Sequence, residues 1–257
     1  MARKVILVTG VSRGIGKCIV SELLDVGEGS DVVVYGVARS EGPLIELKNK
    51  YGELFNYVVG DISEDSVLEE LVEKIKEAYG YIDSIIANAG ILEPVSNVNM
   101  IDGAAWKHLF DVNFFSIVSL VSKTIGLVSA RKGTYVFVSS GASVKPYYGW
   151  GAYGASKAAL NHFASTLANE ESSIKCVAIA PGVVDTQMQV DIRGKYGPAG
   201  MTKDALKRFT DLYKNNQLLD SSVPAKLYAN LASRGIPDNC NGLYLRYDDD
   251  KLKDFAD

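Results

Sequence analysis

The residues best suited to proton transfer are a tyrosine and a lysine four positions apart, Tyr153 and Lys157. They stand in the run GWGAYGASKAAL (149–160), where most neighbouring side chains are small. A helix predicted over 152–172 places both on one face, one turn apart. A nearby ammonium group favours a phenolate and therefore lowers the pKa of the phenol. Such a pair alone is commonly a surface contact, but the small neighbours favour an accessible acid beside a bound carbonyl compound.

Two polar residues earlier in the chain can assist this pair. Ser140 ends a predicted strand, and its hydroxyl can bind the substrate oxygen and support the negative charge that develops there. Asn113 lies within a long helical pattern, where a buried amide needs hydrogen-bond partners. It either caps or kinks that helix, or it holds a water molecule that connects Lys157 to solvent. We therefore predict Asn113, Ser140, Tyr153 and Lys157 as the catalytic residues.

A glycine-rich turn follows the first predicted strand. The run TGVSRGIG (9–16) places Gly10, Gly14 and Gly16 in the spacing Gly-x3-Gly-x-Gly. Glycines allow a tight turn and a close approach of the backbone to phosphate, at a helix N-terminus whose N–H groups attract anions. The turn predicts a dinucleotide site, although a glycine turn without a ligand has the same composition.

The end of the second predicted strand bears on which nicotinamide cofactor fits. NAD sites usually place an acidic residue here to bind the ribose 2′-hydroxyl, whereas this chain has Ala38 and Arg39. Arg13, inside the glycine turn, provides a second cation. Both arginines can be solvated surface residues, but their position suits a 2′-phosphate. We therefore predict NADP(H) as the cofactor.

Further candidate ligands follow the next two predicted strands. Asp61 can accept a hydrogen bond from an adenine amino group, and Asn88 can tie neighbouring strand ends together. Gly90, which closes the run NAG (88–90), permits close contact with a cofactor. Each residue is weak evidence alone. Together they favour a ligand site, because open α/β sheets bind ligands at the carboxyl ends of their strands.

Short runs rich in Val and Ile alternate with longer helical patterns along the 257 residues. Several of these runs lack polar alternation, which is typical of strands buried on both faces. The alternation of strand and helix predicts an α/β fold, a doubly wound parallel sheet with helices on both faces. The predicted strands are 4–8, 31–38, 55–60, 84–88, 134–140 and 175–181, with 243–247 as a candidate last strand. The predicted helices are 14–26, 42–51, 64–79, 103–130 and 152–172.

The composition argues against several classes of protein. A net charge of −4 without a Lys/Arg block does not favour nucleic acid or an anionic membrane as a partner. We expect no apolar run long enough to span a bilayer, and the first residues indicate a strand rather than a signal peptide. The three cysteines fit neither a disulfide framework nor a metal site, and His108 and His162 have no second ligand nearby. These features predict a cytoplasmic protein without a metal.

In this order and spacing, the segments resemble the short-chain dehydrogenase/reductase family, nearly from end to end. The matching elements are TGVSRGIG, Asp61, NAG, Asn113, Ser140, YGASK (153–157) and PGVVDT (181–186). The resemblance implies a Rossmann-type fold with about seven parallel strands, one domain over 1–257, and a substrate loop at about 185–215. It also implies a homodimer or homotetramer, formed through the two longest predicted helices. The cofactor-binding residues that it implies are Gly10, Ser12, Arg13, Gly14, Ile15, Gly16, Arg39, Asp61, Ile62, Asn88, Ala89, Gly90, Tyr153, Lys157, Pro181, Gly182, Val184 and Thr186.

Three segments resemble the branch of that family that contains sepiapterin reductase and benzil reductases. They are SSGASVKPYYGWGAY (139–153), LANEE (167–171) and APGVVDTQMQ (180–189). One position departs from the pterin enzymes, which carry an acidic residue near the last strand where this chain has Arg246. An arginine repels the guanidine-like edge of a pterin. Asp248, two residues further on, takes that place if the alignment shifts.

These features predict an NADPH-dependent carbonyl reductase of a small ketone or vicinal diketone, with Tyr153 as the acid. Two alternatives remain: a pterin reductase or other alcohol dehydrogenase of the family, and a catalytically silent NADP(H)-sensing protein. Aromatic rings offer a flat ligand a large apolar contact area, although Trp150 and a tyrosine can equally pack the start of the helix. The predicted substrate residues are Ser140, Tyr147, Trp150, Tyr153 and Met188, with Tyr148 as a further candidate for the wall.

Overall fold

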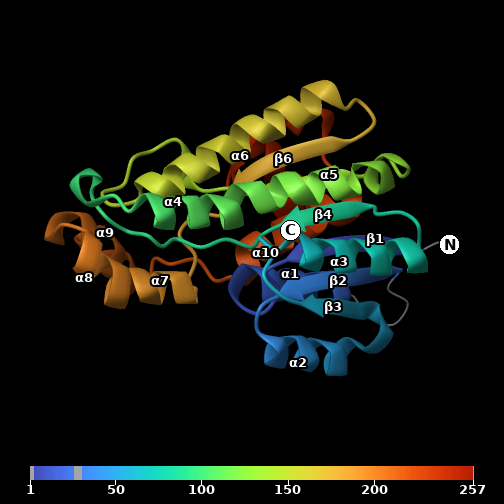
Figure 1. Cartoon of the computed structure of the whole chain (residues 1–257), viewed down its shortest axis with the longest axis horizontal. Coiled ribbons are helices and arrows are strands. Elements are labelled where there is room, and N and C mark those ends of the chain that lie inside the picture. Colours follow the sequence, from blue (N-terminus) through green and yellow to red (C-terminus); the bar gives the residue numbers. More distant parts are fainter. Residues whose placement is uncertain (1–2, 26–30, 257) are drawn as a thin grey trace.

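A sheet of parallel strands forms the centre of the molecule in the computed structural model, which describes residues 3–25 and 31–256 (Figure 1). Within those residues the sheet has seven strands in the order β3-β2-β1-β4-β5-β6-β7. The chain order reverses between β1 and β4, and open sheets bind ligands at such a point, beyond the carboxyl ends of the strands. The predicted doubly wound α/β fold is confirmed. The strands are β1 (Lys4–Thr9), β2 (Val32–Ala38), β3 (Phe55–Val59), β4 (Ser84–Ala87), β5 (Thr134–Val138), β6 (Lys175–Ala180) and β7 (Tyr244–Arg246).

Helices cover both faces of the sheet (Figure 1). On one face lie α1 (Gly14–Leu24), α2 (Glu41–Tyr51) and α10 (Ser222–Arg234), and on the other lie α3 (Asp65–Ala78), α5 (Ser116–Ser129) and α6 (Gly151–Glu170). Each set shares an apolar cluster with the side chains of the strands, which point alternately to the two faces. Because both faces are covered, the strands are continuous apolar runs. Val26, the predicted end of the first helix, lies outside the described residues.

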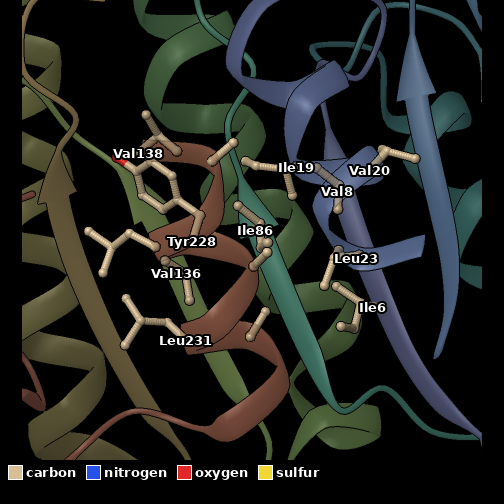
Figure 2. Packing of buried hydrophobic residues seen from close by; sticks show 14 of the residues in the cluster. Ile6, Val8, Ile19, Val20, Leu23, Ile86, Val136, Val138, Tyr228 and Leu231 are labelled. Atoms are coloured by element: carbon tan, nitrogen blue, oxygen red, sulfur yellow. The ribbon is translucent and has the colours of Figure 1, made fainter. Parts of the chain in front are cut away.

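Figure 2 shows how the face with α1 and α10 is packed. Side chains of these two helices interdigitate with those of β1, β4 and β5. The fully buried Tyr228 of α10 also donates a hydrogen bond from its hydroxyl to the carbonyl oxygen of Ile179 in β6. The two helices therefore fix the central strands and the strand ends at the reversal point. The labelled residues are Ile6, Val8, Ile19, Val20, Leu23, Ile86, Val136, Val138, Tyr228 and Leu231.

The predicted helix at 103–130 has an irregular middle. A π-helical turn (Asp111–Phe115) joins α4 (Gly103–Phe110) to α5. The stretch Gly103–Ser129 is long and apolar enough to cross a membrane, with a mean hydropathy of 1.5 over an 18-residue window within it, although the sequence analysis expected no such run. It is a core helix, because it packs against α3 and α6 and buries side chains beside the sheet. Its apolar composition is thus explained by packing.

The segment predicted as a substrate loop, 185–215, is mostly helical. Its helices lie together at the end of the molecule to which the strand arrows point (Figure 1). Phe209 and Leu206 pack with Trp150 and Leu109 in a third apolar cluster, which explains why this Gly- and Pro-containing segment folds over the strand ends. The sequence analysis named neither the longest of these helices nor α10. The elements are α7 (Gln187–Asp191), a π-helical turn (Ile192–Tyr196), α8 (Gly197–Gly200) and α9 (Lys203–Lys214), and the chain closes with α11 (Lys253–Ala256).

Close packing at the start of α1 explains the last glycine of the turn. A Cβ atom on Gly16 would lie 2.2 Å from the carbonyl oxygen of Gly10 and 2.6 Å from the amide nitrogen of Asn88. Such distances are far shorter than any tolerated contact, so only glycine lets α1 approach the ends of β1 and β4. The residue sets the packing of helix against sheet, which is the usual role of the third glycine in this type of turn.

We predict that Gly16→Ala lowers the free energy of unfolding by about 1–3 kcal/mol, because the added methyl group overpacks this junction. The control is Gly126→Ala in α5, where a Cβ would meet no other described atom within 4 Å. That variant should gain about 0.5–1 kcal/mol, since alanine favours a helix over glycine. Urea denaturation of both variants measures the difference. A Gly16→Ala protein as stable as the wild type would contradict this packing.

Candidate active site

One continuous cavity of about 480 Å3 runs along the carboxyl ends of the strands, from the glycine turn to α9. It is lined by Ser140, Tyr153 and Lys157 together with nearly all predicted cofactor and substrate residues. Gly16 and Asn113 do not line it, and they contact residues that do. Tyr148 is not in the lining either, and its side chain is exposed. The topology therefore gathers residues from distant parts of the chain into a single site.

Lys157 is the buried cation of this cavity. Its residue is only 3% exposed, and its Nζ donates a hydrogen bond of 2.8 Å to the carbonyl oxygen of Val138 at the end of β5. The described residues give it no carboxylate partner. Removal from water penalises the ammonium form, so burial lowers the pKa of Lys157 to about 8.

Tyr153 lies one turn before Lys157 on α6, as predicted, and it is also buried. Burial raises the pKa of the Tyr153 phenol above its ordinary value, and a hydrogen bond with the Ser140 side chain partly offsets this. The expectation that the pKa of Tyr153 is lowered is therefore wrong, because burial raises it. The Lys157 Nζ is 6.0 Å from the centre of the Tyr153 ring, and the loss of solvation decides the direction of the pKa shift. Tyr153 is consequently a protonated acid at neutral pH.

Asn113, within the π-helical turn, links the loop after β4 to helix α6. Its side-chain oxygen accepts from the Ile91 amide at 2.8 Å, and its side-chain nitrogen donates to the Ile91 carbonyl at 2.8 Å. The same nitrogen donates to Ser156 Oγ at 3.3 Å, which links the residue to α6. π-helical turns often occur at functional sites, where they redirect a side chain. Whether Asn113 also holds a water molecule beside Lys157 stays a prediction.

A polar network that the sequence analysis missed fixes the loop that carries Ser140. Ser139 Oγ donates to the side-chain oxygen of Asn161 on α6 at 2.6 Å, and the Asn161 amide donates to Ser143 Oγ at 2.8 Å. Ser143 in turn donates to the Ser140 carbonyl, and so does the Tyr244 hydroxyl of β7. Asn161 lies one turn beyond Lys157, so a single helix positions the lysine, the tyrosine and the loop of the serine.

The opposite end of the cavity suits an anionic dinucleotide. Gly10 and Gly14 have positive φ angles of 75° and 53°, and their bare Cα atoms form the floor of the turn. Among the described residues, no acidic side chain occupies the first turn of α1 and no side chain caps it. Its N–H groups are therefore available to a pyrophosphate. The residues present fit a nicotinamide dinucleotide at this point.

Two arginines line the same end beyond the strands. Arg39 follows β2, and its guanidinium lies 3.7 Å from Asp61, whose pKa is held below its ordinary value by Ser63 and Arg39 despite burial. Arg13 precedes α1 and has an extended backbone. The Asp61 carboxylate thus stays ionised, and the two guanidinium groups give this end a net positive charge. Such a pair fits a phosphate better than a bare ribose hydroxyl.

Stacked aromatic rings form the wall next to Tyr153. The Trp150 ring stacks on Phe209 of α9 at 5.2 Å between centroids and lies perpendicular to the Tyr153 ring at 5.7 Å. The centroid of the Tyr147 ring lies 5.1 Å from that of Trp150 and 6.0 Å from that of Phe209. Met188 belongs to the same apolar cluster. Phe209 was not foreseen, because it stands in an amphipathic helix far along the chain. The sequence left two roles possible for Trp150, packing at the start of the helix and contact with the substrate. The structure shows that the ring packs in the third apolar cluster and also lines the cavity.

Arg246 and Asp248 at the end of β7 bind each other. The Arg246 guanidinium donates two hydrogen bonds to the Asp248 carboxylate, at 2.9 and 3.2 Å. This contact lowers the pKa of Asp248, and Arg246 lines the cavity whereas Asp248 does not. The charge of the Asp248 carboxylate is therefore balanced by Arg246 outside the cavity. Of the two residues, Arg246 is the one that can contact a molecule in the cavity.

Comparisons with known proteins agree with this arrangement. Residues 4–197 match the sequence profile of the short chain dehydrogenases. The chain is 61% identical over 252 residues to the uncharacterized oxidoreductase YIR035C of Saccharomyces cerevisiae, covering 98% of each, and the crystal structure of that protein superposes with a TM-score of 0.96 over 99% of this chain and all of that one. It is 55% identical over 258 residues to a benzil reductase ((S)-benzoin forming) of the same yeast, IRC24, covering 97% of each. It is 29% identical to rat sepiapterin reductase, over 90% of this chain and 91% of that one. The branch that the sequence resembled is thus confirmed.

The lowered pKa of Lys157 predicts a specific dependence of stability on pH. Between pH 8 and its ordinary pKa of 10.5, the folded protein binds fewer protons at this site than the unfolded chain. Its contribution to the free energy of unfolding therefore rises with pH across that window, by about 3 kcal/mol in total. Lys157→Met removes this contribution. The stability of the wild type relative to the variant should increase as the pH rises from 8 to 10.5.

Urea denaturation across this pH range measures the effect. Lys145→Met, on an exposed lysine, controls for the loss of one positive charge. A constant difference between wild type and Lys157→Met over the range would mean that the lysine is not desolvated in the folded protein.

Proposed function

The chain belongs to the short-chain dehydrogenase/reductase family and is an oxidoreductase, and we propose that it reduces the carbonyl group of small ketones or vicinal diketones with NADPH. The observation that carries the proposal is the meeting of Ser140, Tyr153 and Lys157 in the cavity that the glycine turn also lines. A proton donor, an oxygen-binding hydroxyl and an anion site in one cavity are what carbonyl reduction by a dinucleotide requires.

Each part of the cavity has a role in holding the cofactor. The first N–H groups of α1 would bind the pyrophosphate, Arg13 and Arg39 would bind the 2′-phosphate, and Asp61 would accept a hydrogen bond from the adenine amino group. Lys157 would hold the ribose next to the nicotinamide, and the loop with Val184 and Thr186 would contact the carboxamide. When bound, NADPH supplies the hydride that the carbonyl carbon accepts. The absence of an acid at Ala38, together with the two arginines, favours NADPH over NADH.

The chain's own residues carry the proton. The Ser140 hydroxyl donates a hydrogen bond to the carbonyl oxygen and orients the compound against Tyr153. As negative charge develops on that oxygen, the Tyr153 hydroxyl transfers its proton there, so the C=O double bond becomes a C–O single bond with a new C–H bond from the hydride and a new O–H bond from the tyrosine. The raised pKa keeps the phenol protonated until this step. Lys157 then stabilises the phenolate that remains, and protons from solvent restore it.

An aromatic vicinal diketone is the substrate class that the cavity wall and a named relative together favour. Tyr147, Trp150 and Phe209 form a cluster of packed aromatic rings at the cavity wall, which suits an aromatic compound. The relative named as a benzil reductase is 55% identical over almost the entire chain. Arg246 disfavours the alternative of a pterin, since it faces the cavity and Asp248 is already paired.

We also propose that the protein is a cytoplasmic homodimer or homotetramer that associates through α5 and α6. The three cysteines, all within the described residues, are free, as a reducing compartment favours. Phe115, immediately before α5, is 54% exposed, and a large exposed apolar side chain next to this helix favours contact with another copy.

The proposal is tested by following NADPH consumption with benzil, in parallel with NADH and with sepiapterin. We expect turnover of benzil with NADPH to exceed both alternatives by at least about tenfold. In Arg39→Ala the ratio of NADPH to NADH efficiency should fall by about tenfold, because a charge-assisted contact to phosphate is lost. Arg131→Ala, which removes an arginine paired with Asp83 outside the cavity, should keep the ratio.

Preference for sepiapterin would overturn the choice of substrate and point to Asp248 as the pterin anchor. Binding of NADPH without turnover of any carbonyl compound would overturn the enzymatic proposal and favour a sensing role.

A further inference from the structure

The charges along the cavity are unevenly distributed. Among the described residues that line it, Asp61 is the one with an acidic side chain, and it lies at the cofactor end beside Arg39. Five lining residues have basic side chains, and three of them already have a role toward the dinucleotide. The other two are Arg208, on the helix α9 that packs on the aromatic wall, and Arg246, on the sheet edge opposite to β3. The part of the cavity left for the carbonyl compound is therefore lined by basic but not by acidic residues. The five are Arg13, Arg39, Lys157, Arg208 and Arg246.

A series of aromatic rings leads from the proton donor to Arg208. The centroid of the Tyr153 ring lies 5.7 Å from that of Trp150, which in turn lies 5.1 Å from that of Tyr147. The Arg208 guanidinium lies 5.6 Å from the centre of the Tyr147 ring, whose π electrons attract a cation. Arg208 also directly precedes Phe209, which stacks on Trp150. The guanidinium is therefore held at the end of the aromatic wall where Tyr147 lies, and Tyr153 is at the other end.

Arg208 has no anionic partner within the part of the chain that the structure describes. Asp204 and Asp211 stand four residues before it and three residues after it on α9, yet neither pairs with its guanidinium. Arg246 differs, because it donates two hydrogen bonds to the Asp248 carboxylate. Of the two basic residues outside the dinucleotide end, Arg208 is thus the one whose charge is not balanced by a carboxylate.

We propose that Arg208 binds a carboxylate group at the end of the substrate that is remote from the reduced carbonyl. This inference rests on the proposed function and extends it, since it makes the preferred substrate an aromatic carbonyl compound with an acidic substituent. The ring of such a compound packs on the aromatic wall, and its carboxylate reaches the guanidinium. A guanidinium presents parallel N–H donors that match the two oxygens of a carboxylate. A compound with an ammonium group in the same place would be repelled.

The exposure of Arg208 sets the size of the effect. The residue is exposed to solvent, so water competes with the carboxylate and dissolved salt screens the contact. Exposed ion pairs change an equilibrium constant by about fivefold at most. Because the carboxylate is remote from the reacting carbonyl, its contact is equally strong in the ground state and in the transition state. The contact therefore lowers KM and leaves kcat unchanged.

4-Carboxybenzil and its methyl ester are the matched substrates for the test, because they have nearly the same shape and differ by one negative charge. For the wild type at low ionic strength, we expect kcat/KM for the acid to exceed that for the ester by about fivefold, through a lower KM. Arg208→Gln should bring this ratio to about one, while kcat/KM for the ester changes by less than about twofold and so shows that the variant is folded. Arg208→Lys keeps the charge and should keep part of the preference. Lys207→Gln, on an exposed neighbour outside the cavity lining, removes the same charge and should leave the ratio unchanged.

No preference of the wild type for the acid, or an unchanged preference in Arg208→Gln, would overturn the inference. An equal fall of the ratio in Lys207→Gln would do the same, because it would show a general effect of surface charge. An equal loss for acid and ester in Arg208→Gln would leave Arg208 as a packing residue of the wall. Failure of the wild type to reduce benzil and both derivatives would instead overturn the proposed function, and the inference with it.

Discussion

The whole site depends on hydrogen bonds that join the ends of β1 and β4 at the base of the cavity. Thr9 Oγ1 accepts from the backbone amides of Asn88 and Ala89, both at 3.0 Å, and the Asn88 side chain donates to the carbonyls of Thr9 and Gly10. These contacts tie two strands that diverge in chain order, so the glycine turn faces the loop of Gly90 at a fixed distance. The predicted role of Asn88, tying neighbouring strand ends, is confirmed. Without these hydrogen bonds, the cofactor end and the proton-transfer end of the cavity would not be held in a fixed relative position.

Burial then sets the chemistry of this site. It acts in opposite directions on its two central groups, raising the pKa of Tyr153 and lowering that of Lys157. Both shifts favour the uncharged form, because a charge in this cavity loses its solvation. The site therefore presents a neutral acid next to a lysine that loses its proton more readily than an exposed lysine does. A reduction needs such an acid at the start, and the lysine charge becomes useful only once the phenolate has formed.

The sequence was sufficient to predict the fold and those parts of the site that residues close together in the chain form. Tyr153 and Lys157 are one helical turn apart, and the glycines follow a strand directly, so spacing alone places them. The sequence was insufficient where tertiary contacts decide. The π-helical turn around Asn113, the stacking of Phe209 on Trp150 and the anchoring of the Ser140 loop by Asn161 join segments far apart in the chain. The prediction that the pKa of Tyr153 is lowered was wrong for the same reason, since burial is a property of the folded protein.

The central claim is that the Tyr153 hydroxyl donates the proton to the substrate oxygen. The most direct measurement is the turnover of benzil with NADPH by Tyr153→Phe, which keeps the ring and removes the hydroxyl, beside Tyr148→Phe on an exposed tyrosine. The account predicts that kcat falls by about 100-fold or more in Tyr153→Phe, the usual contribution of a positioned acid, with little change in Tyr148→Phe. A Tyr153→Phe enzyme that keeps the turnover of the wild type would contradict the account.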